Sequence, residues 1–157
     1  NCTPQHFRFN QSTRFWQGVE RYVLEKGILE EGRVAKRITV LQGPVLDDAN
    51  DLWAKNDEVQ IPLQFWKVVV WKGAAGMRAV GLLVDQEPLL QEDRAYISRP
   101  NEDTPIKVDQ FHVGLKKIAK LAKLDLSVLE PYDTIDQGLP NAAEAVVPIR
   151  QMSDIPL

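Results

Sequence analysis

The pattern that most constrains the fold is a pair of apolar stretches joined by a short turn. One stretch begins at Ile61-Pro62 and peaks over residues 65–71, the turn occupies residues 72–76, and the second stretch covers residues 77–85. Two apolar segments of strand length on either side of a glycine-containing turn are typical of an antiparallel β-hairpin. We therefore predict two neighbouring antiparallel strands near the middle of the chain.

One helix is predicted before this hairpin in the sequence, and another after it. Residues 11–26 carry apolar side chains at helical spacing, with Asn10 or Ser12 as a candidate N-terminal cap and Gly27 as the expected end. A second helix is predicted over residues 110–123, with lysines on its outer face.

A further strand and several loops complete the prediction. Residues 37–42 are expected to form a strand that Gly43-Pro44 breaks, with a continuation at Val45-Leu46 past a bulge. Loops are expected over residues 47–60, over residues 86–105 and in a surface-wrapping tail from Pro131. Because helices and antiparallel strands come in separate runs, the sequence predicts an α+β fold, an antiparallel sheet packed with helices, in a single domain over residues 1–157.

Composition limits the class of protein. The chain has 157 residues, of which 44% are apolar and 26% charged, and its formal net charge is −3. These values suit a globular domain with its own core, and they provide no global basic field for nucleic acid. No apolar run is long enough to span a membrane, and the single cysteine, Cys2, excludes a disulfide within the chain. The chain begins at Asn1 and not at Met, so we expect it to be part of a longer product.

Two sets of residues could contact nucleic acid, each with a more common structural use. Trp53, Trp66 and Trp71 could stack on bases, but Trp66 and Trp71 lie in an apolar strand that is typical of a core. The lysines of the second predicted helix could follow a phosphate backbone, but they equally form the solvated face of an amphipathic helix. They are Lys116, Lys117, Lys120 and Lys123.

The opening segment carries the residues that are best suited to bind a metal ion. Asn1-Cys2-Thr3-Pro4-Gln5 is followed by Asn10, Trp16 and Glu20. A hard cation such as Mg²⁺ takes oxygen ligands and keeps several waters, so an amide oxygen with a nearby carboxylate would suffice. On one ideal helix Asn10 and Glu20 would point about 80° apart and reach one flank. On residue types alone, a helix cap at Asn10 and a solvated charge at Glu20 remain the commoner interpretation.

The order of several motifs resembles a known family. The opening Asn-x-x-Pro-Gln, a second Asn and Trp-x-x-x-Glu are followed in order by ITVLQGPVL, IPLQFWKVVV and FHVGLKKIAKLAKLDLSVL. Together they resemble the DNA/RNA non-specific endonucleases of the ββα-metal (His-Me finger) group, from residue 1 to about residue 130. The resemblance implies that fold, incomplete at the N-terminus, and hydrolysis of DNA and/or RNA with Mg²⁺ or another divalent cation such as Mn²⁺.

The resemblance also implies roles for individual residues. Asn10 matches the catalytic asparagine that binds the metal, and Glu20 matches the catalytic glutamate that orients a metal-bound water. Ser12 is the alternative metal ligand, because it lies eight residues before Glu20, which is the offset that the family uses. Three arginines near these positions could bind substrate phosphate or be ordinary solvated side chains. They are Arg8, Arg14 and Arg21.

One part of the family's site is absent from the sequence. The general base of the family is the histidine of an Asp-Arg-Gly-His hairpin, and the 157 residues contain no such motif. His6 and His112 lie in other contexts and are interpreted as structural or surface residues. We therefore expect an upstream segment of the same gene product, either covalent or as a separate chain, to supply the base, and the chain alone to be nearly inert.

Several properties stay open at this point. The alternative function is a non-catalytic, degenerate nuclease-like module that binds nucleic acid or a protein partner. The family resemblance favours a secreted or periplasmic location over a cytoplasmic one, without fixing it. A self-associated form, or a complex with the upstream segment, is compatible with the sequence, and no membrane association is expected.

Overall fold

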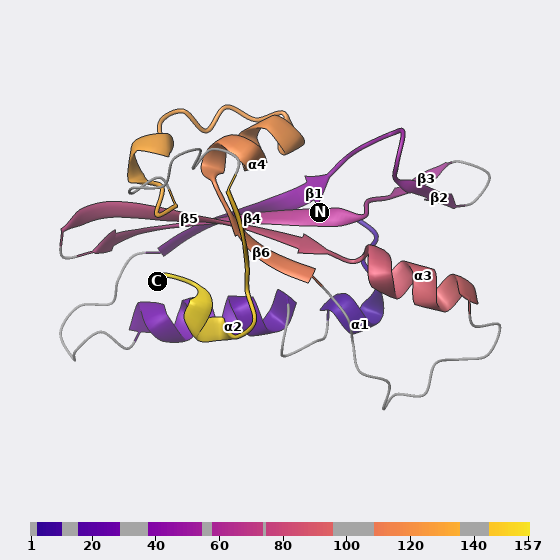
Figure 1. Cartoon of the computed structure of the whole chain (residues 1–157), viewed down its shortest axis with the longest axis horizontal. Helices are drawn as coiled ribbons and strands as arrows, with labels where there is room; N and C mark the ends of the chain where they lie inside the picture. Colours follow the sequence, from indigo (N-terminus) through magenta and orange to yellow (C-terminus); the bar gives the residue numbers. More distant parts are fainter. Residues whose placement is uncertain are drawn as a thin grey trace.

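The fold is built on one antiparallel sheet with helices on both faces (Figure 1). The computed structural model describes residues 3–10, 16–28, 38–54, 58–73, 75–95, 109–135 and 145–157. The sheet has five strands in the order β1-β4-β5-β6-β7, and every neighbouring pair is antiparallel. The strands are β1 (Ile38–Val45), β4 (Gln64–Gly73), β5 (Gly76–Asp85), β6 (Asp109–Val113) and β7 (Val146–Pro148). The predicted α+β class is confirmed.

The predicted hairpin forms the centre of the sheet. β4 and β5 pair without interruption from Gln64 opposite Asp85 to Gly73 opposite Gly76. Gly76 has a φ angle of 124°, a conformation that side-chain-bearing residues rarely adopt, so glycine is required where β5 leaves the turn.

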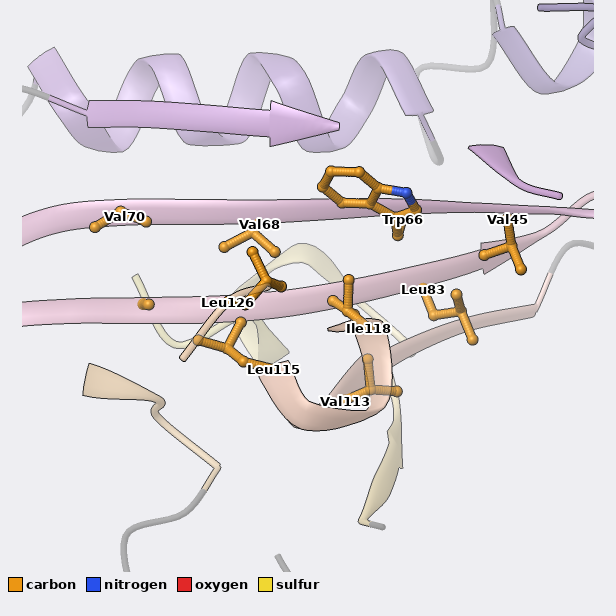
Figure 2. Close-up of a cluster of buried hydrophobic side chains, with 10 residues drawn as sticks. Val45, Trp66, Val68, Val70, Leu83, Val113, Leu115, Ile118 and Leu126 are labelled. Carbon is orange, nitrogen blue, oxygen red and sulfur yellow. The ribbon is translucent and has the colours of Figure 1, made fainter. Parts of the chain in front are cut away.

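Alternation along β4 divides its side chains between two cores, because successive residues of a strand point to opposite faces. Figure 2 shows one of these cores, in which Leu115 and Ile118 lie among Val68, Leu83 and Val113. Leu115 and Ile118 belong to α4 (Leu115–Ala122), which covers that face of the sheet. The lysines predicted on the outer surface of this helix are exposed at positions 116, 120 and 123 and half-buried at position 117.

The opposite face of the sheet is covered by α1 (Phe7–Asn10), α2 (Trp16–Ile28) and α3 (Glu87–Ala95) (Figure 1). Val19 and Val23 of α2 are buried against the sheet, and Ile155, close to the C-terminus, belongs to the same cluster. Phe9 packs on Phe65 with ring centroids 5.5 Å apart. This second core positions the elements that carry the candidate site.

The first strand differs from its prediction. Gly43-Pro44 does not break β1, which pairs with β4 continuously from Ile38 opposite Trp71 to Val45 opposite Gln64. A proline needs no ladder hydrogen bond in an edge strand, and β1 lies at an edge of the described sheet. The carbonyl of Pro44 instead accepts a hydrogen bond from the indole Nε1 of Trp66 at 3.1 Å.

Two predicted loops also contain regular structure. Residues 86–105 were expected to be a loop, but α3 occupies the first part of this range because Pro88 lies in the first turn, where proline is tolerated. Within residues 47–60 and just beyond, β2 (Leu52–Ala54) pairs with β3 (Val59–Ile61). Ile61 therefore ends β3, and does not begin the hairpin strand.

The predicted helix boundaries were partly wrong. α2 continues through Gly27 to Ile28, and residues 11–15 lie outside the described part of the chain. The start of the predicted helix 110–123 is instead strand β6, because residues 109–113 pair with β5 and Gly114 is extended before α4 begins. The described part of the tail contributes β7 and the short 3-10 helices η1 (Glu130–Tyr132) and η3 (Met152–Asp154). In the described residues, no helix combines the length and apolar character needed to traverse a membrane.

Candidate active site

Glu20 lies on α2 beside the two valines that anchor the helix. Val19 and Val23 face the sheet and are buried, so Glu20 is held on the flank of the helix with a side chain that is 43% exposed. On the sheet beneath, alternation places Lys67 on the α2 side of β4, on the same face as Val69. Lys67 Nζ lies 3.3 Å from Glu20 Oε1.

Lys67 is a charged residue inside the core. Its side chain is only 1% exposed, whereas the carboxylate that it contacts reaches solvent. Burial lowers the pKa of the Lys67 ammonium from its ordinary value, and the neighbouring carboxylate of Glu20 opposes that shift. The pair therefore links a buried cation to a half-exposed anion at the edge of a hollow in the surface.

Asn10 is the last residue of α1, a single helical turn. The carbonyl of His6 accepts hydrogen bonds from the backbone N–H groups of Phe9 and Asn10, both at 3.0 Å. Phe9 is fully buried against the sheet, whereas Asn10 is exposed. Asn10 and Glu20 thus come from two separate helices, and the 80° angle expected for one continuous helix does not apply.

A cavity of about 230 Å³ brings these residues together. Asn10 and Glu20 both line it, beside strand β1 and Phe65 of β4. The complete lining consists of Thr3, Gln5, Asn10, Glu20, Gln42, Gly43, Pro44 and Phe65. The two residues that the sequence singled out for metal chemistry therefore share one surface hollow.

The chemistry of the lining suits a hard cation. The polar side chains carry oxygen atoms: the hydroxyl of Thr3, three side-chain amides and the carboxylate of Glu20. Among the described residues, no group of three or more His, Cys, Asp or Glu side chains could hold a metal ion. The donor set fits an ion such as Mg²⁺, which prefers oxygen ligands and keeps most of its water, better than it fits zinc.

A second hollow of about 290 Å³ adjoins the first. It shares Glu20 and Gln42 with the first cavity and is also lined by Lys67. Its remaining residues are apolar: Val23, Leu24 and Val40. Leu24 and Val40 are 64% and 42% exposed, so an apolar surface runs beside the site along α2 and the edge strand β1.

The predicted substrate-binding residues are less closely associated with the cavity. Arg21 is exposed and forms an ion pair with Glu25, with 2.8 Å between Nε and Oε1, and it lines neither hollow. Arg8 is half-buried on α1 and is also outside both linings. Arg14 and the alternative ligand Ser12 fall outside the described residues.

Neither histidine of the chain lines the cavity. Nδ1 of His6 accepts a hydrogen bond from the backbone N–H of Arg8 at 3.2 Å. Nε2 of His112 lies 3.1 Å from the hydroxyl of Thr134, and burial lowers the pKa of this imidazole. Both histidines thus make structural contacts, as the sequence context indicated.

The other candidates for nucleic-acid contact do not line the cavity. Trp66 and Trp71 are buried in the core, while Trp53 is 41% exposed on β2. The lysines of α4 lie on the far side of the sheet from α2 (Figure 1). A strand of nucleic acid at the Asn10–Glu20 cavity would therefore not lie along these lysines.

Sequence reasoning missed Lys67 and Gln42 as members of the site. The two residues face each other across β1 and β4, and both line the second hollow. The available signal was one charged residue inside the otherwise apolar run of residues 65–71, since charged side chains are rarely fully buried. Gln42 carried no such signal, because its place depends on the pairing of two strands.

Comparison with known proteins identifies the family of the chain. The profile of the DNA/RNA non-specific endonuclease family matches residues 1–129, which is most of the chain and includes all of the residues around the cavity. No curated protein and no solved structure shows a significant match. The matched region covers α1, α2, the central hairpin and α4. The chain belongs to the DNA/RNA non-specific endonuclease family.

Proposed function

We propose that this chain supplies the metal-binding part of a divalent-metal-dependent nuclease site that hydrolyses phosphodiester bonds in DNA and/or RNA. The observation that carries the proposal is the shared cavity of Asn10 and Glu20, within a chain of the nuclease family. Asn10 would hold Mg²⁺ through its side-chain oxygen, with Ser12 as the alternative ligand. When bound, the cation would neutralise charge that develops on the phosphate and on the leaving oxygen.

The proposed role of Glu20 is to orient water. Its carboxylate lines the cavity and is half-exposed, so it can accept a hydrogen bond from a water molecule there. Held in this way, the water would face the phosphate in a fixed direction, and orientation of a reactant lowers the barrier. Arg8, Arg14 and Arg21 remain candidates for contact with substrate phosphate outside the cavity lining.

We propose that the general base comes from a segment outside the 157 residues. Neither histidine lines the cavity, so neither is placed to take a proton from water held there. Among the described residues β1 lies at an edge of the sheet, and this edge and the apolar hollow beside it offer a place where an added strand could pair and bury its side chains. The alternative remains a non-catalytic module, because the chain itself lacks the family's Asp-Arg-Gly-His motif.

A plasmid-nicking assay with Mg²⁺ or Mn²⁺ tests the proposal. The 157-residue chain alone should not cleave, and the chain joined to or mixed with its upstream segment should. In the active form, Asn10→Ala should abolish cleavage while the fold, followed by circular dichroism, is kept. Gln17→Ala is the control, because Gln17 is an exposed amide on α2 outside both cavity linings.

Three other outcomes would change the assignment. An active Asn10→Ala protein would exclude Asn10 as the ligand and direct the same test to Ser12→Ala. Cleavage by the purified chain, free of any second polypeptide, would overturn the proposal of an external base. If no form cleaves but the chain retards labelled DNA or RNA in a gel, the non-catalytic module is the correct function.

A further inference from the structure

We infer that Lys67 is a positioning residue, which fixes the carboxylate of Glu20 in the direction that the cavity requires. The inference deepens the proposed nuclease function and rests on it for its catalytic consequence. Lys67 would act through Glu20 and would not touch the substrate.

Lys67 lies in the core of the fold. The side chain extends from the interior strand β4 on the face that carries Phe65 and Val69, and it is 1% exposed. Transfer of an ammonium group into such a place is unfavourable unless a partner compensates, and an apolar side chain of similar volume is often at least as stabilising. Stability alone therefore gives little reason for a lysine at this position, whereas control of Glu20 gives one.

Lys67 and Glu20 form a hydrogen-bonded pair beside the cavity. The ammonium lies 3.3 Å from Oε1 of Glu20, and both side chains line the second hollow. Glu20 also lines the neighbouring cavity with Asn10. A hydrogen bond that holds one carboxylate oxygen leaves the other free to accept from water in that cavity.

Without Lys67, the side chain of Glu20 would be mobile. Its side chain is 43% exposed and projects from the flank of a helix, so several rotamers would be open to it without a fixed partner. Lys67 belongs to a core strand and cannot follow such motion. Orientation of the carboxylate is thus established before any substrate binds, which is how a supporting group contributes to a site.

A purely structural role for Lys67 makes different predictions. If Lys67 only fills the core, its replacement should alter stability and leave the conformation of Glu20 unchanged. If it positions Glu20, its replacement should release the carboxylate while the core stays intact. Lys67→Met separates the two roles because methionine is unbranched, apolar and adaptable in cores. Lys67→Gln is the second variant if the methionine variant fails to fold.

The first experiment follows Glu20 directly in the 157-residue chain. Side-chain ¹³C NMR couplings should report one dominant rotamer of Glu20 in the parent chain and averaging over several rotamers in Lys67→Met. Lys72→Met is the matched control, because Lys72 lies on the same strand but is exposed, and it should behave as the parent chain does. An unchanged Glu20 rotamer in a folded Lys67→Met chain would overturn the inference, whatever the activity.

The second experiment is a double-mutant cycle in the cleavage-competent form. Lys67→Met should lower kcat about 10–100-fold with little change in KM, since small misplacements of catalytic groups can cost about 10²-fold. In a Glu20→Gln background, the same change should lower kcat less than about twofold, because the two residues act as a unit. Independent, multiplying losses would overturn the inference. If no form cleaves, the nuclease proposal fails, and the NMR result still decides whether Lys67 fixes Glu20.

Discussion

The side-chain oxygen of Gln86 accepts a hydrogen bond from the backbone N–H of His6 at 2.9 Å, across 80 positions of the chain. The amide nitrogen of the same fully buried side chain donates to the carbonyl of Pro62 at 2.6 Å. The carbonyl of His6 accepts from Asn10, so one buried amide fixes the start of the helix that carries the proposed metal ligand.

Replacement of this amide should loosen α1. Gln86→Leu removes the side-chain hydrogen bonds to two buried backbone groups, the N–H of His6 and the carbonyl of Pro62, each at a cost of about 1–3 kcal/mol. We expect hydrogen exchange at the amides of Phe9 and Asn10 to become at least about tenfold faster, since about 1.4 kcal/mol corresponds to tenfold. Gln91→Leu is the control, because Gln91 donates to Glu87 at the exposed surface. Unchanged exchange in Gln86→Leu would show that α1 is held by other contacts.

Gly81 should not tolerate a side chain. A Cβ at this position would lie 2.5 Å from the carbonyl oxygen of Val113 and 2.8 Å from Cδ1 of Ile118. The oxygen belongs to the paired strand β6 and cannot retreat without disturbing the ladder, so Gly81→Ala should reduce the free energy of unfolding by about 1–3 kcal/mol or more. Urea denaturation measures the loss. Gly73→Ala, whose Cβ would be 3.5 Å from its nearest neighbour, should cost clearly less.

His112 should make stability depend on pH. Burial lowers the pKa of its imidazole in the folded chain below the ordinary value of 6.5, so the unfolded chain binds the proton more readily. The free energy of unfolding should therefore fall as the pH drops below about 6.5, and this contribution should level off below the folded-state pKa. Urea denaturation of the parent chain and of His112→Gln at about pH 7.5 and about pH 5 compares the two slopes. Equal slopes would mean that His112 does not contribute.

Asp133 should be needed for the start of α4. Its carboxylate is 2% exposed and accepts hydrogen bonds from the backbone N–H groups of Leu115, at 2.5 Å, and Ile135, at 3.1 Å. Asp133→Asn keeps the shape but replaces one acceptor by a donor, so we expect a loss of about 1–3 kcal/mol in the free energy of unfolding. Asp125→Asn, which alters an exposed carboxylate, is the control in the same denaturation series. Equal stability of Asp133→Asn and the parent chain would contradict this role.

The sequence predicted those elements correctly whose pattern lies within a short stretch of residues. The β4–β5 hairpin was predicted from neighbouring apolar residues and a glycine turn, all within one short stretch. α3 was missed because Pro88 suggests a loop as readily as it suggests the first turn of a helix. The β6–α4 boundary was missed because the cap on Leu115 comes from Asp133, 18 residues further on.

The residues of the candidate site also fall into two groups, those that a local motif identifies and those that long-range contacts bring in. Asn10 and Glu20 were identified from a motif within the first 20 residues, whereas Lys67 joins Glu20 across 47 positions of the chain. Gln42 reaches the site through its pairing with Lys67 in the sheet. Contacts of this kind depend on strand register, which a single sequence does not state.

The number of chain positions between the two residues of each contact also implies an order of folding. The β4–β5 hairpin closes a short turn, whereas α1 is held by Gln86 and α2 by a core that includes Ile155 near the other end of the chain. Closing long loops is entropically unfavourable until the contacts that they bring together form, so local hairpins generally precede them. The face that carries Asn10 and Glu20 should thus be the last to assemble and the first to open. The site would therefore form only after Gln86 has bonded to His6 and Ile155 has packed in the α2 core.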